Sequence, residues 1–145
     1  MDTERSLFRT ALLSAAAIIT MNTIGSYVSK MGAGMACPEW PLCPWPETLP
    51  ILLEFIHRVW GLVVVGAVVY TAYVARRLAG HGFSRAVRGL AYLSLLLVAI
   101  QVGMGAVVVF SYLLPENVAL HQLLAQVLLS LQAVIAGAAW ARSAS

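Results

Sequence analysis

Four apolar stretches of helix length constrain this chain more than any other feature. They lie at about 8–29, 52–78, 90–113 and 118–141, and each is long enough to cross a hydrocarbon core of about 30 Å. With 61% hydrophobic and only 10% charged residues, the chain lies outside the range of soluble domains. The sequence therefore predicts an all-α integral membrane protein, with residues 1–145 forming a single transmembrane domain, a four-helix up-down bundle. No cleaved signal peptide is expected, because the first stretch is too long and lacks a clear cleavage site.

The arginines predict the orientation of this bundle. Seven of them fall on one side of the predicted membrane: Arg5, Arg9, Arg76, Arg77, Arg85, Arg88 and Arg142. The other side has Lys30, with Arg58 just inside the second helix. By the positive-inside rule both termini are cytoplasmic, and the loop at about 30–50 faces outward. We expect a multi-pass protein of the cell membrane whose partner is the lipid bilayer and not nucleic acid.

Two histidines are expected at one depth in this bundle. His57 follows Pro50 by seven residues and His121 follows Pro115 by six, so both lie roughly 10 Å below the outer loops. Helices 2 and 4 are diagonal and run in the same direction, which leaves a slot for a flat macrocycle between them. We interpret the pair as axial ligands of a haem iron. The alternative is a polar cluster at the membrane interface, bonded to loop backbone and water.

Glu54 and Arg58 share a helix face with His57, and ionisable groups within a membrane helix mark a functional site by default. Arg58 is placed either to pair with a haem propionate or to form a salt bridge with Glu54, four residues earlier. Both interpretations remain open. Glu54 is the only carboxylate expected inside the bundle, so it is the candidate for acid–base chemistry. Gly61, one turn deeper, would leave room for a large ring.

The other polar and aromatic residues of the helices have structural interpretations. We expect intramembrane glutamines to tie helices together; these are Gln101, Gln122, Gln126 and Gln132. Trp60 and Trp140 are expected in an aromatic belt, Trp40 and Trp45 in that belt or in a lid over the slot, and His81 in a loop. A weak repeat relates residues 21–25, Met-Asn-Thr-Ile-Gly, to residues 101–105, Gln-Val-Gly-Met-Gly.

Cys37 and Cys43 are the only cysteines, and the topology places both in the outer loop, where disulfides persist. One intrachain bridge is possible. It is either a static staple or a reversible redox pair, and the spacing does not choose between them. Two thiols with no nearby histidine are too few for a structural metal.

The order of these motifs, Cys37-Pro-Glu-Trp-Pro-Leu-Cys43, then Glu54-Phe-Ile-His57-Arg58, then His121-Gln122, resembles the haem A synthase family. Members of that family oxidise the C8 methyl group of haem O to the formyl group of haem A for terminal oxidases. The resemblance implies that His57 and His121 bind haem iron and that Glu54 is catalytically important. It also implies that Cys37 and Cys43 are the family's outer-face cysteine pair. The implied partners are haem O, haem O synthase and the terminal oxidase assembly.

The chain departs from that family in one large respect. The family usually has eight helices in two halves, each with a histidine pair, one for the substrate haem and one for a haem B cofactor. This chain has one half and one pair, and its cysteine loop matches the substrate half. We expect a homo-oligomer in which different protomers hold the two haems, rather than one site that serves both. The expected cofactor is a haem, with haem B as cofactor, haem O as substrate, or both.

Two other functions fit parts of the sequence. A bis-histidine haem b electron-transfer cytochrome would share the bundle and both histidines, but it does not require Glu54 or the cysteine loop. A quinone-linked thiol oxidoreductase would use Cys37 and Cys43, but such enzymes usually have a closer pair and a second, relaying pair. An iron held by two histidines has no open position for oxygen, which favours removal of electrons over oxygen binding at that iron.

Overall fold

The computed structural model describes residues 2–78 and 83–143, and within them every regular element is a helix. The elements are α1 (Asp2–Lys30), the short 3₁₀ helix η1 (Ala33–Met35), α2 (Leu49–Arg76), α3 (Phe83–Phe110) and α4 (Pro115–Ser143). All four α-helices are long and apolar enough to cross a membrane. The predicted all-α class is confirmed, although α3 begins about seven residues earlier than expected. The expectation for His81 lies outside the described residues.

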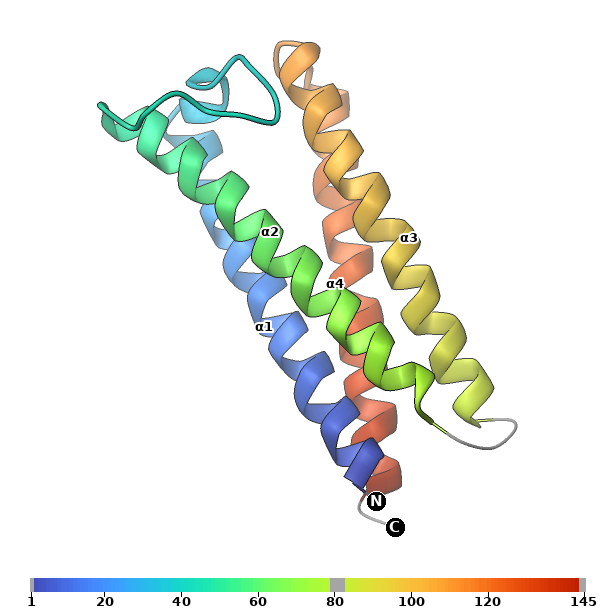
Figure 1. Cartoon of the computed structure of the whole chain (residues 1–145). Helices are drawn as coiled ribbons and strands as arrows, with labels where there is room; N and C mark the ends of the chain where they lie inside the picture. The colour runs from blue at the N-terminus through green and yellow to red at the C-terminus, as the bar shows by residue number, and fades with distance from the viewer. Residues whose placement is uncertain (1, 79–82, 144–145) are drawn as a thin grey trace.

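The four helices form a bundle in which α1 and α3 each pack against both α2 and α4 (Figure 1). The helices α2 and α4 are therefore diagonal partners, as predicted. Both termini lie at the end opposite the loop 31–48, which connects α1 to α2 (Figure 1). We call the end that bears this loop the outer end and the opposite end the inner end. The two hairpins, α1–α2 and α3–α4, lie close at the inner end and diverge toward the outer end (Figure 1).

The chain reverses at the outer end through residues with unusual backbone angles. Gly32, at φ 64°, follows the end of α1, where a left-handed residue commonly terminates a helix. Tyr112 and Leu113, between α3 and α4, adopt φ 53° and 60° without being glycine, which costs roughly 1–2 kcal/mol each. This turn brings the Leu113 side chain to 3.3 Å from the place that a Cβ on Gly34 would occupy. The outer ends of the two hairpins are thus in contact.

Two clusters of buried apolar side chains hold the helices together. The inner cluster comprises Leu7, Ala11, Ala72, Val74, Ala75, Leu78, Val87, Ala91, Ile135, Ala136 and Ala139. The middle cluster comprises Ile18, Val64, Val68, Val98 and Leu128. A hydrogen bond of 2.9 Å between the hydroxyls of Ser14 and Thr71 adds a polar tie between α1 and α2. Neither cluster includes a residue at the level of His57 or His121.

Trp60 makes a contact that the expectation of an aromatic belt did not include. It is half-buried, and its indole N–H donates to the Ala17 carbonyl at 2.9 Å, so it ties α2 to α1. The period of the sequence could not show this, because an indole N–H finds an acceptor in a neighbouring helix only after packing. Trp140 is 59% exposed near the end of α4, as a belt residue would be.

The four glutamines of the helices differ in their burial and in whether they bond to another helix. Gln101 ties α3 to α4, because its amide donates to the His121 carbonyl at 3.0 Å. Gln132 is fully buried, and neither its amide nitrogen nor its oxygen has a partner in the described chain. Gln122 and Gln126 are exposed. The prediction of helix ties is therefore correct for Gln101 and wrong for Gln132.

Candidate functional site

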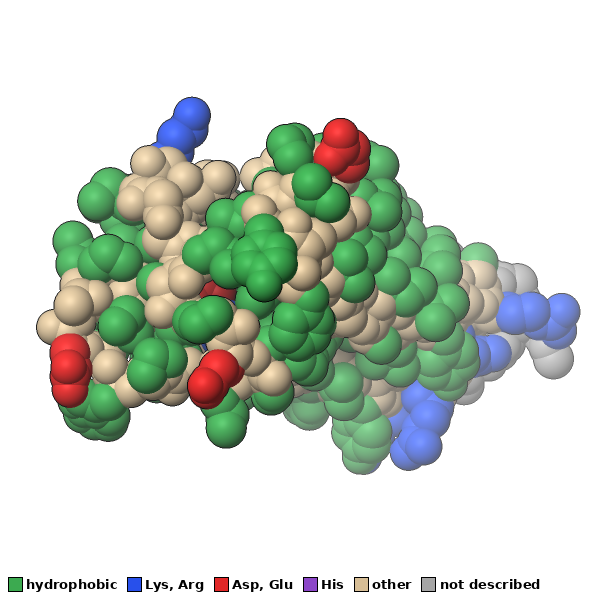
Figure 2. All heavy atoms as spheres, turned by 90° about the horizontal axis from the view of Figure 1, so that it is seen from above, with side chains coloured by type: hydrophobic (Ala, Val, Ile, Leu, Met, Phe, Trp, Pro, Cys, Tyr) green, Lys and Arg blue, Asp and Glu red, His purple; other side chains and the backbone are tan. Residues whose placement is uncertain are grey.

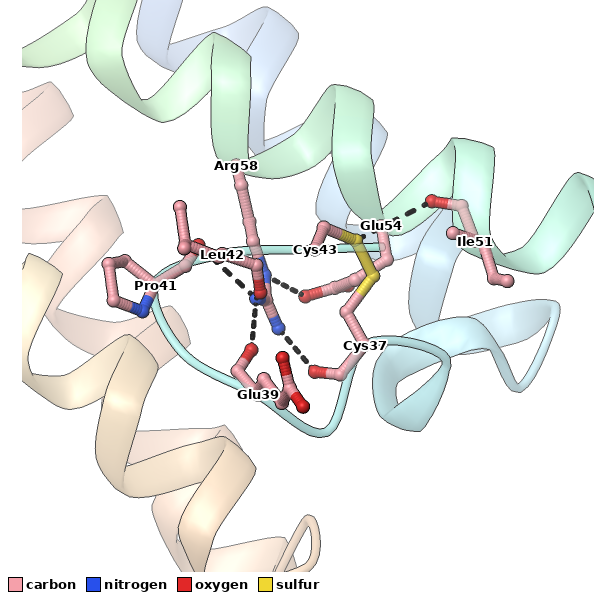
Figure 3. A network of polar contacts seen from close by, with 8 residues as sticks. All are labelled: Cys37, Glu39, Pro41, Leu42, Cys43, Ile51, Glu54 and Arg58. Atoms are coloured by element: carbon pink, nitrogen blue, oxygen red, sulfur yellow. Dashed lines mark hydrogen bonds and ion pairs between the residues drawn. A yellow bond between two sulfur atoms is a disulfide. The ribbon is translucent and has the colours of Figure 1, made fainter. Parts of the chain in front are cut away.

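Arg58 connects α2 to the loop that precedes it. Its Nε donates to Glu54 Oε1 at 3.0 Å, the salt bridge that was one of its two predicted roles. Its Nη2 donates to the Cys37 carbonyl at 2.6 Å. Its Nη1 faces three further carbonyls, those of Glu39 at 2.5 Å, Leu42 at 2.6 Å and Pro41 at 3.3 Å (Figure 3). A guanidinium offers five N–H donors in a fixed plane, so the hydrogen bonds of this one side chain hold the loop 37–42 against α2.

A disulfide between Cys37 and Cys43 closes the same loop (Figure 3). Their Cα atoms are 5.1 Å apart, within the usual range for a bridge, and Cys37 is fully buried. The Sγ of Cys43 lies 3.9 Å from the Ile51 carbonyl oxygen; this is a contact and not a hydrogen bond, because a bridged sulfur carries no proton. The disulfide and the carbonyls that Arg58 binds thus belong to the same short loop.

Glu54 lies beneath this loop in the first turns of α2. Only 5% of its surface is exposed, and it is the only buried carboxylate among residues 3–78 and 84–143. Its bond to Arg58 provides a counter-charge, without which a carboxylate in this apolar setting would be costly. The sequence placed Glu54 and Arg58 on one helix face with His57, and the spacing of α2 gives them that arrangement.

Each predicted histidine ligand rests against a glycine of the preceding helix. A Cβ built on Gly25 in α1 would lie 3.0 Å from Cε1 of His57. A Cβ on Gly105 in α3 would lie 3.7 Å from Cε1 of His121. The first distance is closer than real Cβ contacts normally come, so Gly25 leaves room that alanine would not. The two hairpins therefore present their imidazoles in the same way.

Both imidazoles keep a buried nitrogen without a protein partner. The Nδ1 atoms of His57 and His121 are buried, and nothing in the described chain hydrogen-bonds to either. An unsatisfied buried polar atom costs roughly 1–3 kcal/mol, which a bound ligand can offset. Gln101 Nε2 lies 3.4 Å from His121 Nε2, so this second nitrogen has a polar neighbour.

The donor set suits a haem better than a bare metal ion. Among the described residues, no group of three or more His, Cys, Asp or Glu side chains could hold a metal ion. A protein-held zinc needs at least three such ligands, whereas a haem brings four porphyrin nitrogens and needs only one or two from the protein. Two imidazoles with free nitrogens fit that need.

Sequence reasoning missed Gly25 and Gly105 as parts of the site. It assigned the role of making room to Gly61, whose nearest neighbour is the Met21 side chain at 3.5 Å and not an imidazole. The sequence repeat nevertheless indicated these two positions, because Gly25 and Gly105 are the last residues of the two repeated segments. The repeat thus corresponds to one structural unit, a glycine opposite a histidine, in each hairpin.

The part of the chain that matches known proteins includes His57 and His121. Residues 45–133, more than half of the chain, match a family model described as cytochrome oxidase assembly protein, COX15-CtaA. The chain is 38% identical over 94 residues to the heme A synthase of Symbiobacterium thermophilum, covering 62% of this chain and 30% of that protein. It is 33% identical over 88 residues to that of an Exiguobacterium species, covering 59% and 27%. The match spans less than a third of either relative, and no solved structure matches.

The hydrogen bonds from Arg58 to the loop 37–42 lead to a prediction. In Arg58→Lys the charge remains, but one ammonium group cannot serve a carboxylate and four carbonyls. Because hydrogen bonds to a charged group are worth about 1.5–3 kcal/mol, we expect the amides of residues 37–43 to exchange with deuterium about tenfold faster or more. Mass spectrometry of the protein in nanodiscs measures this. Arg58→Ala should lose the same protection and regain it with added guanidinium but not with methylammonium; unchanged exchange in Arg58→Ala would contradict this role of Arg58.

Proposed function

The chain belongs to the haem A synthase family of cytochrome oxidase assembly proteins, and from that premise we propose that it oxidises the C8 methyl group of haem O to the formyl group of haem A. The chain would thus be a membrane oxidoreductase. It would receive haem O from its synthase and deliver haem A to terminal oxidase assembly. Members of the family with the name heme A synthase support the pathway; the reaction of this chain is our proposal.

The observation that carries the proposal is the pair of imidazoles, each with an orphaned buried nitrogen and each opposite a glycine. His57 and His121 would hold one haem from its two sides, between the diagonal helices α2 and α4. A bound haem would supply an iron that exchanges electrons, and the imidazoles of His57 and His121 would hold it. We assign this place to haem O as substrate. The chain offers no second histidine pair for a haem B cofactor within the described residues.

Glu54 would serve the reaction at the outer edge of that haem. It is buried, it lies one turn before His57, and Arg58 fixes its carboxylate from the loop side. Conversion of a methyl group to a formyl group consumes one water molecule and releases four protons and four electrons. The electrons would go to an acceptor outside the chain, and a positioned carboxylate can accept the protons or orient the water. Arg58 would act chiefly as a positioning residue, since its pairing with a haem propionate would have to replace bonds to loop carbonyls.

The arrangement of charge supports an orientation in the membrane. Seen from the outer end, apolar and acidic side chains cover much of the near surface with a basic side chain at its rim, and further Lys and Arg side chains lie toward the far end (Figure 2). Exposed apolar side chains of the outer loops include Leu42 and Trp45 from the cysteine loop and Tyr112 from the α3–α4 turn. We propose that the inner end, with both termini, faces the cytoplasm and that the disulfide loop lies on the outer face.

We also propose that copies of the chain associate in the membrane. A groove of about 370 Å³ between α1 and α4 is lined by Ile19, Asn22, Thr23, Ser26, Gln126 and Leu129. Side-chain amides that face lipid are stabilised by hydrogen bonds to another helix. Because an amide is both a donor and an acceptor, the amides of this groove can pair with those of the same groove on a second copy. A dimer in nanodiscs should become monomeric in Asn22→Leu/Gln126→Leu but not in Thr20→Val, whose hydroxyl already bonds to Ala16. A monomeric parent protein in a mass measurement would contradict the association.

The reaction is tested by co-expression with a haem O source, followed by extraction and mass analysis of the haem. The parent protein should contain haem A or a hydroxylated intermediate. Glu54→Gln keeps the size of the side chain but cannot accept a proton as a carboxylate does, so it should retain haem O while haem A formation falls at least a hundredfold, as loss of acid–base catalysis predicts. Haem A at the parent level in Glu54→Gln would refute its role. Extraction of haem B alone from the parent would instead favour the electron-transfer cytochrome.

The glycine opposite His57 supplies a test of haem placement that does not depend on turnover. Gly25→Ala places a methyl group 3.0 Å from the imidazole, and overpacking costs typically 1–3 kcal/mol, so haem affinity should fall about fivefold or more. Absorbance titration of the haem-free protein measures it. Gly105→Ala, at 3.7 Å, should have a smaller effect, and Gly89→Ala, with no neighbour within 4 Å, should have none. Equal affinities for all three variants would be evidence against haem at this position.

A further inference from the structure

A second groove lies at the inner end, far from the histidines. It has a volume of about 240 Å³ and is lined by Thr3 and Ser6 of α1 and by Tyr70, Tyr73, Val74 and Arg77 of α2. Its lining is unlike a lipid-facing surface, because it brings together four hydroxyl groups and one guanidinium.

Two positive charges converge beside this groove. The guanidinium carbon of Arg77 lies 4.6 Å from the centre of the Tyr73 ring, and that of Arg76 lies 5.4 Å from it. Arg77 also donates to the Tyr73 hydroxyl, and Tyr70 stacks on Tyr73 with ring centres 6.2 Å apart. The aromatic ring thus holds two like charges side by side.

No carboxylate in the described chain neutralises these charges. The ion pair of the outer end belongs to Arg58 and Glu54. Adjacent cations without a counter-charge repel each other, so an anion from outside the chain would bind them favourably. The guanidinium plane of Arg77 matches the oxygens of a phosphate.

The hydroxyl groups supply further donors. Within residues 2–78 and 83–143, the Thr3, Ser6 and Tyr70 hydroxyls line the groove, and no hydrogen bond to another protein group uses them. On the bilayer side of the groove the surface becomes apolar, with Leu13 67% exposed on α1 and Val63 46% exposed on α2. A ligand with a phosphate head and apolar chains would match both regions at once.

We propose that this groove is a binding site for the phosphate headgroup of an anionic phospholipid. Arg77 and the hydroxyls of Thr3, Ser6 and Tyr70 would bind the phosphate oxygens, Arg76 would add charge, and the acyl chains would lie along the exposed faces of α1 and α2. Basic residues at a membrane surface attract anionic lipids by about 1 kcal/mol each. A lipid there would bridge α1 and α2 at the inner end. The site is independent of the haem function proposed above.

Native mass spectrometry of the full chain tests the site. The protein is released from nanodiscs that contain phosphatidylcholine and phosphatidylglycerol, and the retained phosphatidylglycerol is counted. We expect one molecule to be retained by the parent protein, and retention to fall about fivefold in Arg77→Gln and measurably in Ser6→Ala. The matched control is Arg85→Gln, which removes an exposed charge from the same end of the bundle outside the groove and should retain the lipid as the parent does.

Two results would overturn the proposal. Equal loss of phosphatidylglycerol in Arg77→Gln and Arg85→Gln would show diffuse surface charge instead of a site. Displacement of the lipid by an equal concentration of inorganic phosphate would show that the groove binds a free anion and not a lipid. Retention of the lipid in the presence of phosphate, with loss confined to the groove variants, would support the lipid assignment.

Discussion

A guanidinium at the edge of a bilayer must find acceptors, and the outer end of this molecule is built around that requirement. Arg58 donates to the carboxylate of Glu54 and to carbonyls across the loop 37–42. Through these bonds one side chain fixes a loop that has little regular structure, and it supplies the counter-charge of a buried acid. The disulfide shortens the loop so that its carbonyls reach the guanidinium. The position of Glu54 above His57 therefore depends on Arg58.

Below Arg58 and the loop that it binds, the two hairpins repeat one arrangement. In each, a glycine of the first helix lies against a histidine of the second, and each histidine keeps a buried nitrogen without a partner. The apolar clusters fill the inner and middle parts of the bundle, and the hairpins diverge above them (Figure 1). A ligand held between the histidines would take the place of a third cluster. The inner and middle parts of the bundle are thus packed with apolar side chains, whereas the outer part holds the histidines, Glu54 and Arg58.

Much of this arrangement could be predicted from the sequence, and the exceptions have physical causes. The length of the apolar segments predicted the helices, because a segment of about 20 apolar residues has few other ways to pair its backbone N–H and C=O groups in lipid. Helical spacing placed Glu54, His57 and Arg58 on one face. The carbonyl partners of Arg58 were beyond prediction, since an irregular loop has no periodicity from which to infer its path. Gly25 and Gly105 required knowledge of which helices meet, and the buried Gln132 shows that polarity alone does not reveal whether a partner exists.

The central claim is that His57 and His121 hold one haem between the hairpins. The most direct measurement is electron paramagnetic resonance of the purified protein reconstituted with ferric haem, together with the haem-to-protein ratio. The parent protein should bind one haem per chain with a low-spin signal typical of two axial imidazoles. His57→Ala and His121→Ala should each convert that signal to high spin, because one axial position is lost. An unchanged low-spin signal and full haem content in the variant that lacks both histidines would contradict the claim.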